Sequence, residues 1–331
     1  MKEGRVLGRT VKRLLFNYNS IAIFLLLLIV GTLFVGKFTR NYSTIIIESS
    51  LYGFIAIGLS LVMISGYIDL SVGFQAATSA VVLILMINAT GSIVLSVVTA
   101  ILAGAVMGVI NGTAVAVFGI DPLIATIATN FVFKGFVYYF TKDGSIYPEG
   151  DLRDALRTGI AKLSFFNTQV LTLTVIIIAA ALILVAFIMK RTNFGNSLYI
   201  SGDNPLAGRL AGINIKRVAF IAYILCGICC GIAGVFLASN SSAATYTLGE
   251  GRNIFAISAC VIGGVKMAGG KGTMLNVLIG ILIMRIISTG MNLLFLPVSW
   301  VDFVSGALLI AVLIIDKATA MRSSRKLNPN V

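Results

Sequence analysis

The sequence predicts an all-α polytopic membrane protein with about ten transmembrane helices, and three observations support that fold class. Of the 331 residues, 58% are hydrophobic and only 11% are charged, whereas a soluble domain carries about a quarter of charged residues. Apolar runs long enough to cross a hydrocarbon core of about 30 Å recur along the chain. The basic residues behind the formal net charge of +13 lie in short clusters between these runs, which favours topogenic charge over nucleic-acid binding.

The first predicted span covers 21–35. It follows a basic N-terminal segment and lacks a small-x-small cleavage site, so we expect an uncleaved anchor. The other nine predicted spans are 43–64, 70–89, 91–118, 122–141, 168–189, 217–239, 253–265, 273–295 and 298–315. The 253–265 segment is too short to cross a bilayer, so we expect it to be tilted, broken or buried in the bundle.

The span order also indicates an internal duplication. A turn at 66–69 and a glycine-rich turn at 263–272 fall in matching places within the blocks 43–141 and 217–315. One block starts outside and the other inside, so spans 2–5 and 7–10 form a possible inverted repeat.

The distribution of Lys and Arg predicts the orientation. With the N-terminus inside, 16 basic residues face the cytoplasm and 7 face outward, which places both termini in the cytoplasm. We therefore expect a single transmembrane domain over 1–331, with a cytoplasmic basic tail at 1–19, a cytoplasmic loop at 190–217 and a cytoplasmic tail at 317–331. The lipid bilayer is its main solvent, and no nucleic acid is expected as a partner.

Catalytic and metal-binding chemistry is not expected. The chain contains no His, so His-based relays and triads are excluded. Its four cysteines, Cys226, Cys229, Cys230 and Cys260, all lie in apolar segments and are expected to be small packing residues. The glycine-rich stretch around Lys271 fails the Walker pattern because Gly272 stands where Ser or Thr is needed. We predict no catalytic residue, no metal and no cofactor.

The loop 190–217 is the most informative segment. Within it, 204–212 is predicted to be a short helix, because Asn204 suits the N-cap, Pro205 the first turn and Gly212 the position past its end. Leu206 and Leu210 lie four residues apart on one face. Such a helix either inserts into a partner's groove or lies on the bilayer surface.

Polar residues near or within the spans are candidates for a gate or pathway. Asp69 and Ser71 stand at the start of an apolar helix, where Asp69 is either an N-cap or part of a gate or ion site. Further pathway candidates are Asn111, Asn130, Lys134 and Asn292. Asn130 and Lys134 share the 122–141 span with several aromatic residues, so this helix could offer rings and donors to a small polar solute.

Five stretches resemble the permease subunits of bacterial ABC sugar importers of the ribose, xylose and galactose type, within the branched-chain amino acid permease-like superfamily. They are SGYIDLSVG (65–73), INGTAVAVFGIDPLIATIAT (110–129), RTNFGNSLYISGDNPLAGRLAGINIKRV (191–218), AISACVIGGVKMAGGKGT (256–273) and MNLLFLPVSW to LLIID (291–316). They occur in family order and cover most of the chain.

The resemblance implies a permease of the bacterial cytoplasmic (inner) membrane that imports a small polar solute and is not itself an enzyme. It implies three kinds of partner: cytoplasmic ATP-binding subunits, an extracytoplasmic solute-binding protein, and a second permease copy or a sister permease. A monosaccharide is the expected cargo, with furanone autoinducers and other polar metabolites as alternatives. The coupling helix of the family falls on 191–218, which implies coupling roles for Gly195, Asn204, Pro205, Gly208, Arg209 and Gly212.

The chain departs from the family pattern at two places. Tyr67 stands where Gly is usual, and Asn253 and Phe255 replace two acidic residues ahead of the Ala-rich stretch.

Two other functions are alternatives to an importer permease. An ion-coupled secondary transporter would use Asp69, Glu48 or Asp302, but it leaves the loop 190–217 unexplained. A membrane-embedded enzyme has no supporting nucleophile, base or metal cluster.

Overall fold

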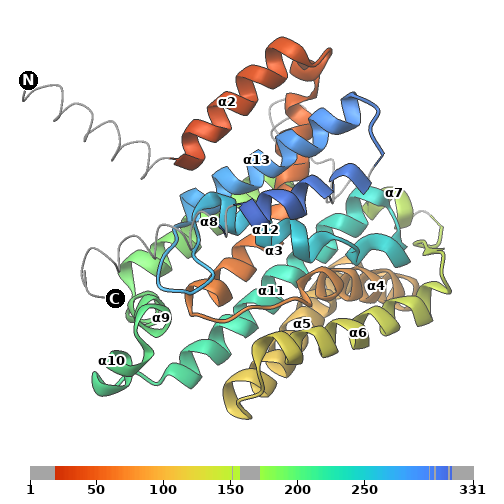
Figure 1. The fold of residues 1–331 in the computed structure, drawn as a ribbon. Coiled ribbons are helices and arrows are strands. Elements are labelled where there is room, and N and C mark those ends of the chain that lie inside the picture. Colours follow the sequence, from red (N-terminus) through yellow and green to blue (C-terminus); the bar gives the residue numbers. More distant parts are fainter. Residues whose placement is uncertain are drawn as a thin grey trace, which may run out of the picture.

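The computed structural model describes residues 19–150, 152–156, 172–297, 299–301, 303–311 and 314. Over these residues the protein is a bundle of long helices with one small two-stranded sheet (Figure 1). The tails predicted at 1–19 and 317–331 lie outside the described residues, apart from Asn19, as do Asp302 and most of the segment between α7 and α8.

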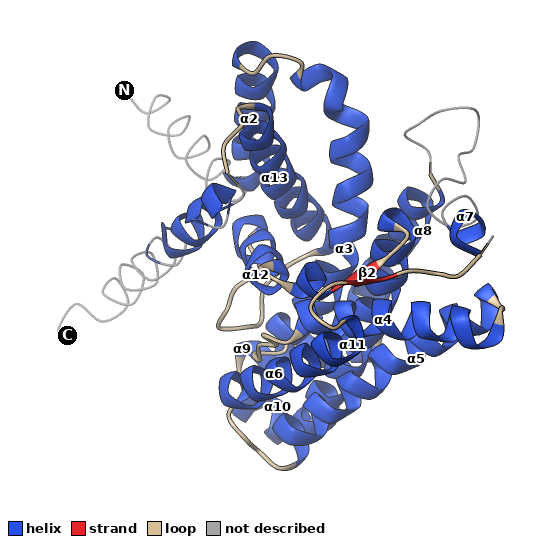
Figure 2. Ribbon diagram, turned by 90° about the vertical axis from the view of Figure 1, so that its right-hand side faces the viewer, coloured by secondary structure: helices blue, strands red, loops and turns tan. Residues whose placement is uncertain are grey.

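The helices follow one another with short connections. In chain order they are α2 (Asn19–Phe34), α3 (Tyr42–Ile64), α4 (Val72–Thr90), α5 (Ile93–Gly112), α6 (Pro122–Thr141), α7 (Leu152–Leu156), α8 (Leu173–Arg191), α9 (Asn193–Asp203), α10 (Pro205–Leu210), α11 (Ile215–Ser241), α12 (Arg252–Gly263) and α13 (Met274–Leu293). A π-helical turn, Thr113–Val117, extends α5, and 3-10 turns cover Phe38–Asn41 and Tyr246–Gly249. Strands β1 (Ser145–Ile146) and β2 (Ala244–Thr245) pair antiparallel, as Figure 2 shows for β2 near α4 and α11.

These helices confirm the all-α polytopic fold class. In the described part, seven helices are long and apolar enough to cross a membrane. Two shorter apolar helices, Ser20–Phe34 and Ser299–Ala311, occupy the first and last predicted spans. Helix α12 covers the segment predicted to be too short, and its residues from Phe255 to Gly263 are all buried. Of the three expectations for this segment (tilted, broken or buried in the bundle), the structure therefore supports burial in the bundle. The total of ten crossings and the inverted repeat stay predictions.

Capping side chains fix several helix starts. Ser92 accepts a hydrogen bond from the backbone N–H of Leu95 at the start of α5, and Asn214 accepts one from Arg217 at the start of α11. Asp121 accepts two backbone N–H groups at the start of α6, where Pro122 occupies the first turn. Because the first N–H groups of a helix have no intrahelical partner, these side chains satisfy them.

Helices α5 and α11 share the most extensive contact of the bundle, because glycines let their backbones touch. Gly104 and Gly108 of α5 lie opposite Gly227 and Gly231 of α11, and Gly112, four residues further on, lies against Phe220. A Cβ atom added at Gly231 would lie 2.9 Å from the Cα of Ile101, and one added at Gly227 would overlap the backbone of α5. Small residues four apart permit this close approach between membrane helices.

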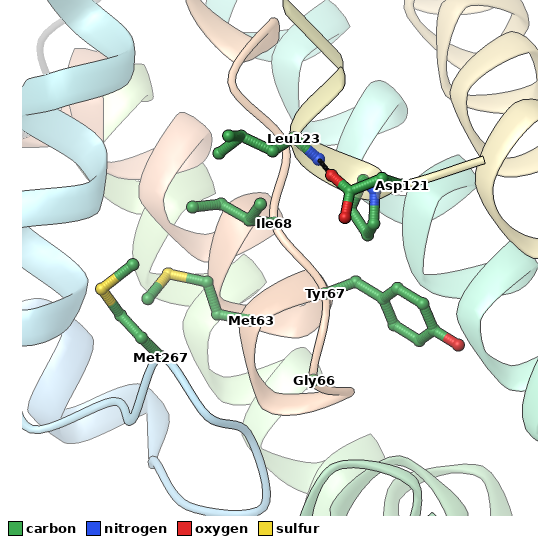
Figure 3. Close-up of a pocket in the computed structure, with 8 residues that line it drawn as sticks. Met63, Gly66, Tyr67, Ile68, Asp121, Leu123 and Met267 are labelled. Carbon is green, nitrogen blue, oxygen red and sulfur yellow. Dashed lines mark hydrogen bonds between the residues drawn. The ribbon is translucent and has the colours of Figure 1, made fainter. Parts of the chain in front are cut away.

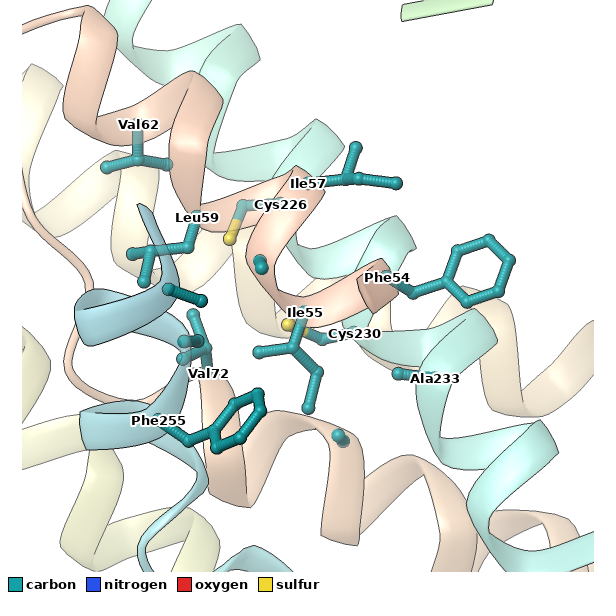
Figure 4. Packing of buried hydrophobic residues seen from close by; sticks show 14 of the residues in the cluster. Phe54, Ile55, Ile57, Leu59, Val62, Val72, Cys226, Cys230, Ala233 and Phe255 are labelled. Carbon is teal, nitrogen blue, oxygen red and sulfur yellow. The ribbon is translucent and has the colours of Figure 1, made fainter. Parts of the chain in front are cut away.

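Helix α3 runs through the centre of the molecule. Sixteen of its residues are buried, and Figure 4 shows Phe54, Ile55 and Ile57 packed beside Cys226 and Cys230 of α11. Cys226, Cys230 and Cys260 are buried, and Cys229 is half-buried. All four are free thiols, in agreement with the predicted packing role.

Candidate functional site

The segment between α3 and α4 holds a buried carboxylate in a polar network. Asp69 is fully buried, and its Oδ1 accepts bonds from the backbone N–H (2.9 Å) and the hydroxyl (2.6 Å) of Ser71. Its Oδ2 accepts bonds from Gln75 Nε2 (2.8 Å) and Asn111 Nδ2 (3.1 Å). Four donors therefore surround the carboxylate, as a charge removed from water requires.

This network differs from the N-cap interpretation of Asp69. The N-cap of α4 is Ser71, whose side chain makes no capping bond. Asp69 lies two residues earlier and bonds to Ser71 and to side chains of α4 and α5. The sequence placed Asp69, Ser71 and Asn111 among the pathway candidates, and the structure brings these three together. Gln75 was missed, although it lies one helical turn after Ser71.

Neighbouring helices hold the same segment in place. Tyr223 of α11 donates its hydroxyl to the carbonyl of Ile68 (2.8 Å), and Thr126 of α6 accepts the backbone N–H of Leu70 (3.1 Å). Asn253 of α12 donates to the carbonyl of Leu70 (3.2 Å). The segment from 65 to 71 is thus bonded to three helices that are distant in sequence.

A second polar group lies on α6. Lys134 pairs with Glu250 at 3.7 Å, and the two side chains are 33% and 46% exposed. The ammonium group lies 5.1 Å from the ring centroid of Tyr138 and 5.6 Å from that of Phe74, and the Tyr138 hydroxyl bonds to Glu250 (3.1 Å). This face of α6 is polar and partly open, so it is suited to contact water or solute. The sequence identified Lys134 but missed Glu250, whose segment is distant in sequence.

Asn130 and Asn292 are not among the residues that form these two groups. Asn130 is half-buried on α6, one turn before Lys134, and its Oδ1 has no hydrogen-bond partner within the described chain. Asn292 is exposed at the last turn of α13. Glu48 of α3, considered as an ion-coupling residue, forms an ion pair with the buried Arg285 of α13.

The predicted coupling helix is present as α10. Thr192 accepts the backbone N–H of Gly195 (3.2 Å) at the start of α9, a helix that the sequence analysis did not predict. Asn204 then accepts the N–H of Ala207 (3.0 Å), and Pro205 stands in the first turn of α10. Gly212, with φ of 80°, follows the helix end. The capping pattern read from the sequence is therefore confirmed.

The two faces of α10 differ. Leu206 and Leu210 are 70% and 84% exposed, and Arg209 is exposed beside them. Gly208 is buried, and a Cβ atom added there would lie 3.1 Å from side-chain atoms of Ile200 and Ile215. A bulky residue at 208 would therefore push α10 away from α9 and α11.

These apolar helices define the chain as a multi-pass membrane protein. Residues 41–313 match the family described as branched-chain amino acid transport system / permease component. The chain belongs to this family of ABC importer permeases, so it is a transport component and not itself an enzyme.

Several curated proteins are similar over most of their length. The Autoinducer 2 import system permease protein of Escherichia coli O9:H4 (strain HS) is 33% identical over 88% of this chain and 85% of its own. The L-arabinose ABC transporter permease protein of Azospirillum brasilense is 31% identical over 93% and 89%. The Ribose import permease protein of Escherichia coli (strain K12) is 31% identical over 90% and 92%. No solved structure matches the chain.

Proposed function

We propose that the chain is the transmembrane permease subunit of an ATP-binding cassette importer of the bacterial inner membrane. It moves a small polar solute, with a monosaccharide as the expected cargo, into the cell while partner subunits hydrolyse ATP. The names of its relatives support this proposal, since they describe importers of autoinducer 2, L-arabinose and ribose.

The exposed leucine pair on α10 is the observation that carries the coupling role. A six-residue helix is too short to be stable by itself in water, so its caps and the contacts of Gly208 hold it. Leu206 and Leu210 then point away from the protein, as in a helix that inserts into a partner's groove. A cytoplasmic ATP-binding subunit is the partner that this helix would contact, with Arg209 as a charged neighbour of the apolar pair.

The proposed roles of the other coupling residues are structural. Gly195 packs directly on the backbone of Met189, which sets the angle at which α9 leaves α8. Asn204, Pro205 and Gly212 delimit α10. These residues would fix where the docking face lies and would make no contact with the partner themselves.

Helices α5, α6 and α8 and the small sheet would contact lipid, a second permease and the solute-binding protein. In the most apolar stretches of α5, α6 and α8, only 28%, 22% and 17% of the residues are buried. The exposed faces of these helices are therefore available to lipid and to a second permease copy or a sister permease. The polar face of α6 at Asn130 and Lys134 is costly to expose to lipid and would line the solute pathway. With both termini cytoplasmic, β1 and β2 lie outside, where an extracytoplasmic solute-binding protein would dock.

A pull-down of the tagged chain from gently solubilised membranes tests this proposal. A buried Leu side chain contributes about 1.5–3 kcal/mol, so the double variant Leu206→Ala/Leu210→Ala should lose most of the copurifying ATP-binding subunit. Leu206→Met/Leu210→Met keeps the apolar face and should retain it. If the wild type captures no ATP-binding subunit and its uptake survives ATP depletion, the proposal is wrong.

The ion-coupled secondary transporter considered from the sequence would use Asp69, which is fully buried. Collapse of uptake by an ionophore at constant ATP would favour it. The four donors around Asp69 argue for a structural carboxylate instead, since they already occupy its oxygens.

A further inference from the structure

Three segments that are far apart in the sequence meet through glycines beside the coupling loop. We call Gly66, Gly202, Gly269 and Gly270 the glycine junction. A Cβ atom added at Gly269 would lie 2.7 Å from the Cα of Gly66 and 2.8 Å from the Cα of Gly202. Gly66 and Gly269 have φ of 89° and 87°, a backbone region that other residues adopt at a cost of about 1–2 kcal/mol.

Hydrogen bonds tie the same segments together. The N–H of Gly270 donates to the carbonyl of Ile64 at the end of α3 (2.9 Å). The hydroxyl of Tyr199 in α9 donates to the carbonyl of Gly272 (2.7 Å). The end of α3 is therefore bonded backbone to backbone to the loop after α12, and α9 is bonded to the same loop through the Tyr199 side chain.

The junction connects directly to the docking helix. Gly202 lies in the last turn of α9, and only Asp203 and Asn204 separate it from α10. A shift of α10 caused by a partner would move Gly202 against Gly66 and Gly269. Close-packed contacts of this kind transmit displacement because they have no room to absorb it.

On the other side of the junction lies a pocket of about 260 Å³. Figure 3 shows its lining: Met63, Gly66 and Ile68 from the α3 side, Asp121 and Leu123 at the start of α6, and Met267 from the loop after α12. Gly66 belongs to both the junction and the pocket wall, and Met267 lies two residues before Gly269. A movement of the junction would therefore change the width of the pocket.

The chemistry of the lining suits a small uncharged solute. Met63 and Met267 present flexible thioethers that adapt to irregular shapes. Asp121 is the charged residue of the lining, and no basic side chain of the described residues lines the pocket. An anion would meet a carboxylate without a counter-charge, which disfavours it.

We propose that this pocket is the inner gate of the transport pathway, that it passes a small uncharged polar solute, and that the glycine junction sets its width according to the position of α10. This inference rests on the proposed function, because the force on α10 comes from an ATP-binding subunit.

Thiol labelling of the complete complex tests the gate. Met267→Cys places a reporter in the pocket, while the native cysteines are buried or half-buried within helices. In inside-out vesicles, a non-hydrolysable ATP analogue should change the labelling rate of this reporter at least threefold. Gly202→Ala in the same background should abolish the change while basal ATP hydrolysis persists. Gly135→Ala is the matched control, since no described residue lies within 4 Å of its added Cβ, and it should keep the change.

A second variant guards against a folding defect at Gly202. Tyr199→Phe removes only the hydroxyl bond to Gly272 and should reduce the response to the ATP analogue by about half or more. A full response in both Gly202→Ala and Tyr199→Phe would overturn the role of the junction. Two methanethiosulfonate reagents, one neutral and one sulfonated, test the solute class with rates normalised to a free thiol. The neutral reagent should react faster in the pocket, and equal rates would refute the uncharged cargo.

The two proposals fail in different ways. If ATP is hydrolysed by a copurified subunit but the Met267→Cys reporter does not respond, the inner-gate proposal is contradicted and the importer proposal is retained. If no ATP-binding subunit copurifies, both the importer proposal and the inner-gate proposal are contradicted.

Discussion

Glycine brings backbones into contact in two regions of this protein, and the two contacts differ in kind. Between α5 and α11, glycines four residues apart lie on two regular helices, and the contact is continuous along the bundle. In the glycine junction, three segments contribute Gly66, Gly202, Gly269 and Gly270, and Gly66, Gly269 and Gly270 have positive φ. The first contact joins two regular helices, whereas the second joins two loop segments to the last turn of α9.

The difference indicates different roles. The contact between α5 and α11 buries extended helix faces, so it contributes mainly to the stability of the bundle. The junction buries little side-chain surface but lies between the docking helix α10 and the pocket at Met267. We therefore expect substitutions between α5 and α11 to reduce stability, and substitutions in the junction to reduce coupling more than stability.

The largest effect is expected at the interface of α5 and α11. Gly227→Leu would force a branched side chain into the backbone of α5, which should lower the free energy of unfolding by about 3 kcal/mol or more. Size-exclusion chromatography of a fluorescent fusion should show loss of the monodisperse peak. A normal peak with an unchanged melting temperature would contradict the claim that the contact between α5 and α11 contributes more to stability than the glycine junction does.

Asp69 links the contact between α5 and α11 to the glycine junction. It is hydrogen-bonded to Asn111, which precedes Gly112 on α5, and it lies three residues after Gly66. Asp69→Asn replaces an acceptor of four bonds by a group that also carries donors. Leaving buried donors unsatisfied costs about 1–3 kcal/mol each, so the melting temperature should fall clearly. Asp121→Asn, at an exposed carboxylate, is the comparison and should fall less. Equal shifts would show that burial of Asp69 is not decisive.

A smaller loss of stability is expected in the junction. Gly269→Ala imposes about 1–2 kcal/mol of backbone strain, and its added Cβ would lie 2.7 Å from the Cα of Gly66 and 2.8 Å from that of Gly202, so the backbone must shift slightly. Thermal unfolding should shift modestly, whereas uptake driven by ATP should drop by an order of magnitude in the same preparation. A loss of stability that accounts for the whole loss of uptake would remove the special role of the junction.

The smallest effect is expected where a helical glycine has open space. Gly135→Ala on α6 meets no atom of the described residues within 4 Å, so it should change stability by at most about 0.5–1 kcal/mol, in the stabilising direction. Differential scanning fluorimetry of the purified variant measures this shift. A strong destabilisation would mean that this face of α6 is covered tightly by another chain.

Most of the helices could be predicted from the sequence because lipid imposes a strong length and composition signal. The predicted spans 43–64 and 122–141 agree closely with α3 and α6. The predicted start at residue 70 was two residues early, since α4 begins at Val72. The segment before it is held by side-chain bonds to Asp69 and not by helical bonds. Ser71 and Gln75 are near Asp69 in the sequence, but Asn111 comes from α5, which a local pattern does not reveal.

The bounds of α10 were predicted well, because capping residues act locally. Asn204, Pro205 and Gly212 act within a few residues of α10, so their spacing was sufficient to delimit the helix. The orientation of α10 was not predictable, because it depends on Ile200 and Ile215 packing against Gly208. The Lys134–Glu250 pair was missed for a similar reason, as it joins α6 to the segment before α12.

The sequence was enough to establish an all-α membrane protein with a capped helix outside its spans, because composition, the length of apolar runs and local capping act over short stretches of chain. The permease family was indicated separately, by the five stretches that resemble it. The tertiary structure alone decided that Gly66, Gly202 and Gly269 touch, that Asp69 is enclosed by four donors, and that Leu206 and Leu210 face outward. Each of these depends on which helices pack together, because contacts across long sequence separations are set by the three-dimensional arrangement of the bundle and not by neighbouring residues.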